Sequence, residues 1–201
     1  AGAYTLTNAT NNVGTIAAAT GAGVIKYVDA DALAVGTVNT VGITRTGDVL
    51  LNNQTGDLTL TQNVAIGANT LRLESVAGKV DQTGGTITAG TLGVNAGTSI
   101  SLASNNAVAT TFAAKATNGD VLFKNANGYD INTVAADGTI FTLANGVTAV
   151  AAGKNITLDS GGAVTQTAGK DVTATATGGL ELKGAGAYTL TNATNNVGTI
   201  A

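Results

Sequence analysis

The sequence predicts an all-β chain that folds as a solenoid, and three observations lead to this prediction. Short runs with apolar side chains at every second position recur along the 201 residues. Glycine, asparagine, aspartate or serine brackets nearly every run, as strand and turn signals require. Residues 1–17 also return without a change as residues 185–201. A solenoid can be extended by such tandem copies, whereas a closed barrel cannot.

Each alternating run places its apolar side chains on one face of a strand. One segment, residues 107–117, is rich in alanine and is the best helix candidate, but it contains valine and threonine and has no capping box, so it is interpreted as a strand. The clearest runs, in chain order, are residues 4–8, 48–53, 57–62, 70–75, 99–104, 120–125, 139–143, 155–160 and 180–184.

The repetition divides the chain into one full unit, residues 1–184, and the start of the next identical unit, residues 185–201. Within the unit, a shift of 96 residues places apolar residues on apolar residues, which predicts sub-repeats over residues 1–96 and 97–184. Side chains that match at this shift are expected in the core. The expected core positions are Leu6, Ile16, Ile25, Tyr27, Val35, Leu102, Phe112, Val121, Phe123 and Ile131.

Composition excludes several function classes. The net charge of −3 is spread thinly and no basic stripe is present, so no nucleic-acid partner is expected. No apolar run is long enough for a membrane helix, so no membrane insertion is expected. Histidine and cysteine are absent and the carboxylates are scattered, so we expect no enzyme, no catalytic residues, no metal site and no cofactor.

Three weaker patterns have a structural alternative. Asp29 and Asp31 could form an exposed calcium site or flank a turn. Recurring Thr-x-Thr pairs could bind ice, but their irregular spacing favours ordinary outward-facing strand positions. Asn8, Asn53, Asn155 and Asn192 stand in Asn-x-Thr sequons, which could accept glycans or arise by chance in a chain rich in asparagine and threonine.

Several segments carry a family resemblance. DLTLTQ, VDQTGGTITAGTLGVNAG and GAVTQTAGKDVTATATGGLELKG, together with the 17-residue repeat, resemble the repeat region of filamentous-haemagglutinin-type exoproteins, the large two-partner-secretion adhesins of Gram-negative bacteria. The resemblance covers essentially the whole chain. It implies a right-handed parallel β-helix with rungs of roughly 20 residues and about nine rungs in a unit.

The resemblance also implies a function. The chain is expected to be a structural repeat of a giant extracellular adhesin or matrix fibre, an elongated shaft for cell attachment or biofilm scaffolding, at the cell surface or secreted. Its expected partners are neighbouring repeats of the same chain stacked end to end, other fibre chains at its sides, and a surface glycan or host-cell ligand. The alternative is a repeat module that itself binds carbohydrate or a host protein, for which the few aromatic residues, 3% of the chain, offer little contact surface.

Overall fold

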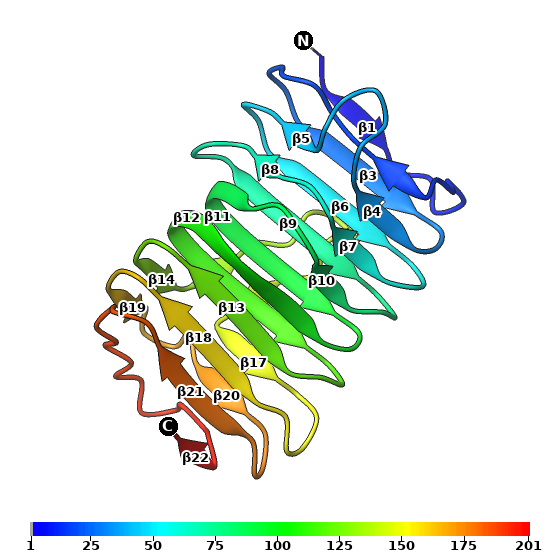
Figure 1. The fold of residues 1–201 in the computed structure, drawn as a ribbon. Helices are drawn as coiled ribbons and strands as arrows, with labels where there is room; N and C mark the ends of the chain where they lie inside the picture. The colour runs from blue at the N-terminus through cyan, green and yellow to red at the C-terminus, as the bar shows by residue number, and fades with distance from the viewer. Residues whose placement is uncertain (1) are drawn as a thin grey trace.

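The computed structural model describes residues 2–201 as a parallel β-helix of about nine turns, with successive turns about 22 residues apart and no helix among the described residues. Figure 1 shows the turns stacked along one axis, with the two chain ends at opposite ends of the stack. The predicted fold class and the predicted rung length are therefore confirmed.

Most strands are short because the chain bends at the corners of each turn, whereas β11 and β12 continue through corners. Their bounds are β1 Tyr4–Leu6, β2 Thr15–Ile16, β3 Ile25–Asp29, β4 Leu33–Val35, β5 Ile43–Thr44, β6 Val49–Asn53, β7 Leu58–Leu60, β8 Val64–Ala65, β9 Thr70–Ser75, β10 Val80–Gln82, β11 Ile87–Ala96, β12 Ile100–Ala116, β13 Val121–Asn125, β14 Tyr129–Ile131, β15 Thr133–Val134, β16 Ala144–Asn145, β17 Val147–Ala149, β18 Ile156–Ser160, β19 Val164–Gln166, β20 Val172–Ala174, β21 Gly179–Lys183 and β22 Thr199–Ile200.

Each turn contributes to three faces, which follow one another along the chain. The first face contains β1, β3, β6, β9, the second half of β11, the end of β12, β17 and β20. The second face contains β2, β4, β7, β10, the start of β12, β13, β18, β21 and β22. The third face contains β5, β8, the start of β11 and the middle of β12. It continues into β14 and β19, of which β14 pairs with β12 at Thr111 and Phe112, at the corner with the first face.

The core consists of columns of apolar side chains that run parallel to the axis. Inward positions alternate with outward ones along each strand, and parallel pairing places each inward side chain on its counterpart in the next turn. One column of the first face is Tyr27, Leu51, Leu73, Val94, Ala114, Val147 and Val172. One column of the second face is Leu33, Leu58, Val80, Ile100, Val121, Ile156 and Leu180. All of these side chains are buried.

Three aromatic side chains pack together within this core. The rings of Phe112 and Phe123 stack with centroids 3.9 Å apart. Tyr129 packs edge-on against both rings, at 5.8 Å and 5.2 Å, an arrangement that aromatic quadrupoles favour. Its hydroxyl is buried and has no hydrogen-bond partner.

Two local predictions have different outcomes. Residues 107–117 lie almost entirely within β12, so the preference for strand over helix is confirmed. The prediction of a strand over residues 139–143 is wrong. These residues form a turn closed by the bridge between Asp137 and Phe141, because Phe141 is buried against the outside of the first face and not in the core of the helix.

Most of the expected core positions are buried, but the 96-residue shift does not relate equivalent sites. Ile16 is half-buried and Leu6, in the first turn, is 56% exposed; the other eight positions are buried. Ile25 lies on the first face, whereas Val121, its partner at this shift, lies on the second. Every face needs the same alternation of inward apolar and outward polar residues. Apolar residues therefore match at a shift of 96 residues even though the matched residues lie on different faces.

The two identical segments, residues 1–17 and 185–201, occupy different places. In the first copy Tyr4 pairs with Ile25 of the following turn, and Ile16 pairs with Val35. In the second copy Tyr188 pairs with Val164 of the preceding turn, on the third face, and Ile200 pairs with Leu180. The same sequence therefore takes a placement that depends on the turn beside it.

Candidate functional site

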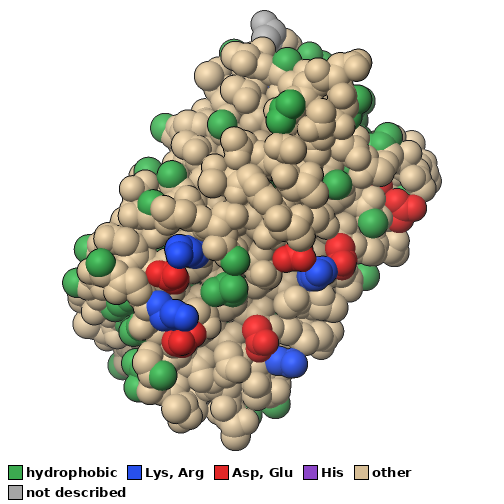
Figure 2. Space-filling model, in the orientation of Figure 1, with side chains coloured by type: hydrophobic (Ala, Val, Ile, Leu, Met, Phe, Trp, Pro, Cys, Tyr) green, Lys and Arg blue, Asp and Glu red, His purple; other side chains and the backbone are tan. Residues whose placement is uncertain are grey.

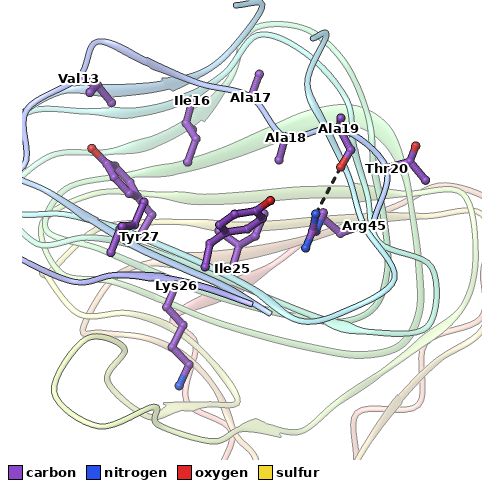
Figure 3. A pocket seen from close by; sticks show the side chains of 12 residues that line it. Val13, Ile16, Ala17, Ala18, Ala19, Thr20, Ile25, Lys26, Tyr27 and Arg45 are labelled. Carbon is purple, nitrogen blue, oxygen red and sulfur yellow. Dashed lines mark hydrogen bonds between the residues drawn. The ribbon is translucent and has the colours of Figure 1, made fainter. Parts of the chain in front are cut away.

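At the first turn the core columns end in an apolar hollow of about 420 Å³. Tyr4, Leu6 and Val13 border it with their exposed side chains, and Ile25 and Tyr27 of the next turn form its buried wall. Figure 3 shows the side chains of Ile25, Tyr27 and Arg45 on this wall, while Lys26 points away from it. Exposed apolar surface of this kind is typical of a contact surface.

Arg45 is a buried cation at the edge of this hollow, only 4% exposed. Its guanidinium donates hydrogen bonds to the carbonyl oxygens of Gly2, Ala22 and Gly23 at 3.1, 2.9 and 3.3 Å. It also lies over the ring of Tyr4, 5.2 Å from the centroid, a cation–π contact. Since Gly2 precedes β1 and Ala22 precedes β3, one side chain connects three consecutive turns, although its Nε has no partner.

A second apolar hollow, of about 310 Å³, lies at the last turn. The Tyr188 hydroxyl lies there 2.7 Å from the carbonyl oxygens of both Leu158 and Lys183 and has one hydrogen to donate to this pair of acceptors. The lining residues are Val172, Leu180, Leu182, Tyr188, Leu190, Asn195, Val197 and Ile200. Both ends of the described stack therefore present apolar side chains.

A hairpin arm, residues 132–146, leaves the solenoid between β14 and β17 and folds back over the outside of the first face. Its base is closed by the hydrogen bond from the Gly146 N–H to the Asn132 carbonyl, 2.9 Å, and by the antiparallel pair β15–β16. Val134, Phe141 and Ala144 of the arm pack against Leu50 and Ala113, all buried.

Polar contacts fix the arm to several earlier turns. Asp137 forms an ion pair of 2.6 Å with Lys26. Asn52 Nδ2 donates to the Ile140 carbonyl at 2.8 Å, and Arg72 Nε donates to the Ala135 carbonyl at 3.1 Å. These contacts fall on outward positions of β3, β6 and β9, so the arm ties consecutive turns together from outside.

Several charged side chains of the surface lie in pairs of opposite sign. Figure 2 shows acidic and basic groups side by side on a surface that is otherwise mostly uncharged. Lys124 lies 3.5 Å from Asp159, and Lys79 lies 2.8 Å from Asp81. The carboxylate of Asp81 raises the pKa of the Lys79 ammonium group above its ordinary value.

The carboxylates considered in the sequence make hydrogen bonds within the solenoid. Asp29 is buried and accepts from the Tyr27 hydroxyl at 2.7 Å and from the Val13 N–H at 3.0 Å. Asp31 accepts from Asn12 Nδ2 at 2.9 Å. Among residues 2–201 no three histidine, cysteine, aspartate or glutamate side chains form a group that could hold a metal ion.

Burial raises the pKa of three tyrosine hydroxyls, those of Tyr27, Tyr129 and Tyr188. Desolvation, followed by the hydrogen bond and the charge of Asp29, raises the pKa of Tyr27. Desolvation likewise raises the pKa of Tyr129 and of Tyr188.

The described part of the chain has no helix that is long and apolar enough to cross a membrane.

The apolar ends and the hairpin arm were not located from the sequence. The tandem identity signalled that turns meet at the ends but not which side chains line them. The arm had a usable signal in its Asn-Gly and Asp-Gly dipeptides, at residues 145–146 and 137–138, which mark turns.

Comparison with protein-family models, with curated proteins and with solved structures gives no match for this chain.

Proposed function

We propose that this chain is a section of the shaft of a large extracellular adhesin or matrix fibre, of the Gram-negative two-partner-secretion type that its repeats resemble. The observation that carries the proposal is the course of the core columns. They pass through about nine turns and reach apolar hollows at both ends. Together with the return of residues 1–17 as residues 185–201, this favours units that stack on one another.

In such a shaft the function is mechanical. Parallel backbone hydrogen bonds join each turn to the next, and the apolar columns exclude water from a narrow core. The length of the rod is then set by the number of units. A unit of about eight layers of 4.8 Å adds roughly 40 Å.

The surface favours a shaft over a module that itself binds carbohydrate or a host protein. Tyr4 is the one aromatic side chain that is exposed among residues 2–201, and it lies at the end of the stack and not along its side. Sugar-binding grooves rely on aromatic faces, and the sides of this solenoid present mainly threonine, asparagine, small residues and paired charges.

Electron cryotomography of cells that produce the natural full-length protein tests the proposal. We expect antibodies against residues 1–201 to label fibres at the cell surface. Deletion of one 184-residue unit should shorten each fibre by roughly 40 Å, and deletion of a second unit by the same amount again. An intracellular location, or a fibre length that does not respond to the number of units, would refute the proposal.

A further inference from the structure

Two pairs of amides form the same clasp between turns; Gln82 and Asn106 are buried, whereas Gln166 and Asn195 are half-buried. In the first pair, Gln82 Nε2 donates to Asn106 Oδ1 at 2.9 Å, and Asn106 Nδ2 donates back to Gln82 Oε1 at 3.1 Å. Each amide oxygen also accepts a backbone N–H. Ile87 N–H donates to Asn106 Oδ1 at 2.8 Å, and Ser104 N–H donates to Gln82 Oε1 at 3.2 Å.

The second pair repeats this pattern near the last turn. Gln166 Nε2 donates to Asn195 Oδ1 at 2.6 Å, and Asn195 Nδ2 donates to Gln166 Oε1 at 3.1 Å. The Val172 N–H donates to Asn195 Oδ1 at 2.8 Å, and the Asn192 N–H donates to Gln166 Oε1 at 3.2 Å. Gln82 and Gln166 stand in the related segments VDQTGG and VTQTAG, so the motif marks a corner where one turn is fastened to a later one.

The asparagine of the second clasp has an identical counterpart, Asn11, because residues 185–201 repeat residues 1–17. Both asparagines donate one amide hydrogen within their own turn: Asn11 to the Leu6 carbonyl at 3.1 Å and Asn195 to the Leu190 carbonyl at 3.3 Å. The second hydrogen of Asn11 goes forward to the Val28 carbonyl at 3.1 Å, whereas that of Asn195 goes back to Gln166.

The hydrogen-bonding capacity of the amide distinguishes these two states. An asparagine side chain offers two donor hydrogens and two acceptor lone pairs. Asn195 uses all four, two as donor and two as acceptor. The two hydrogen bonds that the Asn11 side chain makes in its own placement are both donated. A preceding turn would therefore add two accepted hydrogen bonds, one from its glutamine amide and one from a backbone N–H as in Val172, and its glutamine would replace one donated bond by another.

We propose that, where one unit follows another, Gln166 of the preceding unit clasps Asn11 of the next and fixes the register in which the units join. This rests on the proposed function, in which units stack in tandem. The partner surface is the last turns of a preceding copy of this chain, and residues 185–201 already show how the segment sits on it.

The proposal has a structural consequence that can be measured. In a joined pair of units, residues 1–17 of the second unit should take the placement of residues 185–201. Tyr4 then lies beside Val164 of the preceding unit, as Tyr188 does, and leaves the position beside Ile25 that it occupies in the first copy. The two placements exclude each other, because they put the same tyrosine at different ladder positions. Tyr4 stands in the ladder that runs from Ile25 through Phe112 to Gln166, whereas Tyr188 pairs with Val164, two residues before Gln166.

Disulfide trapping in a chain of two units reports which placement is adopted. The chain contains no cysteine, so an engineered pair gives no background. Thr165→Cys in the first unit with Thr5→Cys in the second unit reports the clasped placement. Thr5→Cys with Lys26→Cys, both in the second unit, reports the other. Neighbouring parallel strands lie about 4.8 Å apart, within the range that a disulfide bridges.

The 201-residue chain supplies matched controls. Thr165→Cys with Thr189→Cys and Thr5→Cys with Lys26→Cys should each form a disulfide there, since residues 164 and 188 are ladder neighbours and residues 5 and 26 are partners. In the two-unit chain we expect a disulfide between position 165 of the first unit and position 5 of the second. The disulfide between positions 5 and 26 of the second unit should be lost.

The glutamine itself is tested with a matched variant. Gln166→Leu in the first unit removes the clasp and should abolish the disulfide between positions 165 and 5. Gln82→Leu removes the other clasp and should leave that disulfide unchanged.

Electron micrographs of the same two-unit chain separate the two hypotheses. One continuous rod with the disulfide between positions 165 and 5 supports both. One continuous rod with the disulfide between positions 5 and 26, or with a disulfide between positions 165 and 5 that is insensitive to Gln166→Leu, overturns the clasp and leaves the shaft intact. Two separate bodies overturn the proposed stacking and the clasp with it.

Discussion

The carboxylate of Glu74 accepts a hydrogen bond of 2.7 Å from the backbone N–H of Thr142, although 68 residues separate them in the chain. Asn95, one turn further along, donates to the Thr142 carbonyl at 2.9 Å. Glu74 and Asn95 are pairing partners on the first face, and both are buried. Two successive turns therefore hold the tip of the hairpin arm by polar contacts, beside the apolar contacts of Phe141.

The arm should stabilise the turns beneath it. Phe141→Ala removes a fully buried ring from the contact with Leu50 and Ala113, and we expect a loss of about 3–5 kcal/mol in the free energy of unfolding. Leu143→Ala is the matched control, because Leu143 is 54% exposed and should change stability by less than about 0.5 kcal/mol. Urea titration followed by circular dichroism measures both. Equal midpoints for the two variants would show that the arm contributes no packing energy.

Gly93 provides the space into which the arm fits. A Cβ at this position would lie 2.7 Å from Val134 Cγ1 and 2.8 Å from Phe141 Cζ. Gly93→Ala should therefore displace the arm and destabilise the protein by about 1–3 kcal/mol. Gly14→Ala, where nothing lies within 4 Å, should be near neutral. The Thr142 N–H should exchange its hydrogen faster in Gly93→Ala but not in Gly14→Ala. Unchanged protection in Gly93→Ala would contradict the claim that Gly93 provides the space for the arm.

Tyr129 carries a buried hydroxyl without a partner, which is costly by about 1–3 kcal/mol. Tyr129→Phe keeps the ring contacts with Phe112 and Phe123 and should stabilise the protein by about 1 kcal/mol. Tyr188→Phe loses the hydrogen bond that the hydroxyl donates to the Leu158 and Lys183 carbonyl oxygens, each 2.7 Å away, and should destabilise the protein by a similar amount. Thermal unfolding of both variants tests the contrast, and a destabilised Tyr129→Phe would indicate an acceptor for that hydroxyl.

The buried tyrosines also predict a limit at alkaline pH. Burial raises the pKa of Tyr129, and burial together with Asp29 raises that of Tyr27. A tyrosine whose pKa is higher in the folded state keeps its proton while the unfolded chain loses it above about pH 10. Stability should therefore be unchanged below that pH and fall as the pH rises beyond it. In Tyr129→Phe this loss of stability should be smaller. Urea titrations at about pH 8 and about pH 11, on either side of the ordinary tyrosine pKa, measure the loss in each protein. An equal loss in both proteins would contradict the role given to Tyr129.

The alternation of apolar residues predicted most of the strands, because each turn needs only inward apolar side chains and turn residues, and the tandem repetition of residues 1–17 predicted the solenoid. The alternation could not assign a strand to a face. Ile25 and Val121 match at a shift of 96 residues and lie on different faces, since all three faces have the same requirement. Contacts between turns join pairs such as Gln166 and Asn195, which are 29 residues apart and have no local pattern.

The hairpin arm was missed for a related physical reason. Residues 139–143 alternate like a strand, yet their apolar side chains are buried against the outer surface of the first face. This requires Gly93 and Ala113 to be small at outward positions of other turns. Such a match between distant outward positions leaves no trace in the local sequence. The end hollows were missed because they depend on which side chains are left uncovered by a neighbouring turn.

The most direct test of stacking is a cryo-electron microscopy map of a chain that contains two or more complete units. We expect a single straight rod in which layers about 4.8 Å apart continue without interruption through the junction. The hollow beside Arg45 of the second unit should be filled by the first unit. Separate bodies joined by a flexible link, with that hollow open to solvent, would contradict the proposal that these repeats form one shaft.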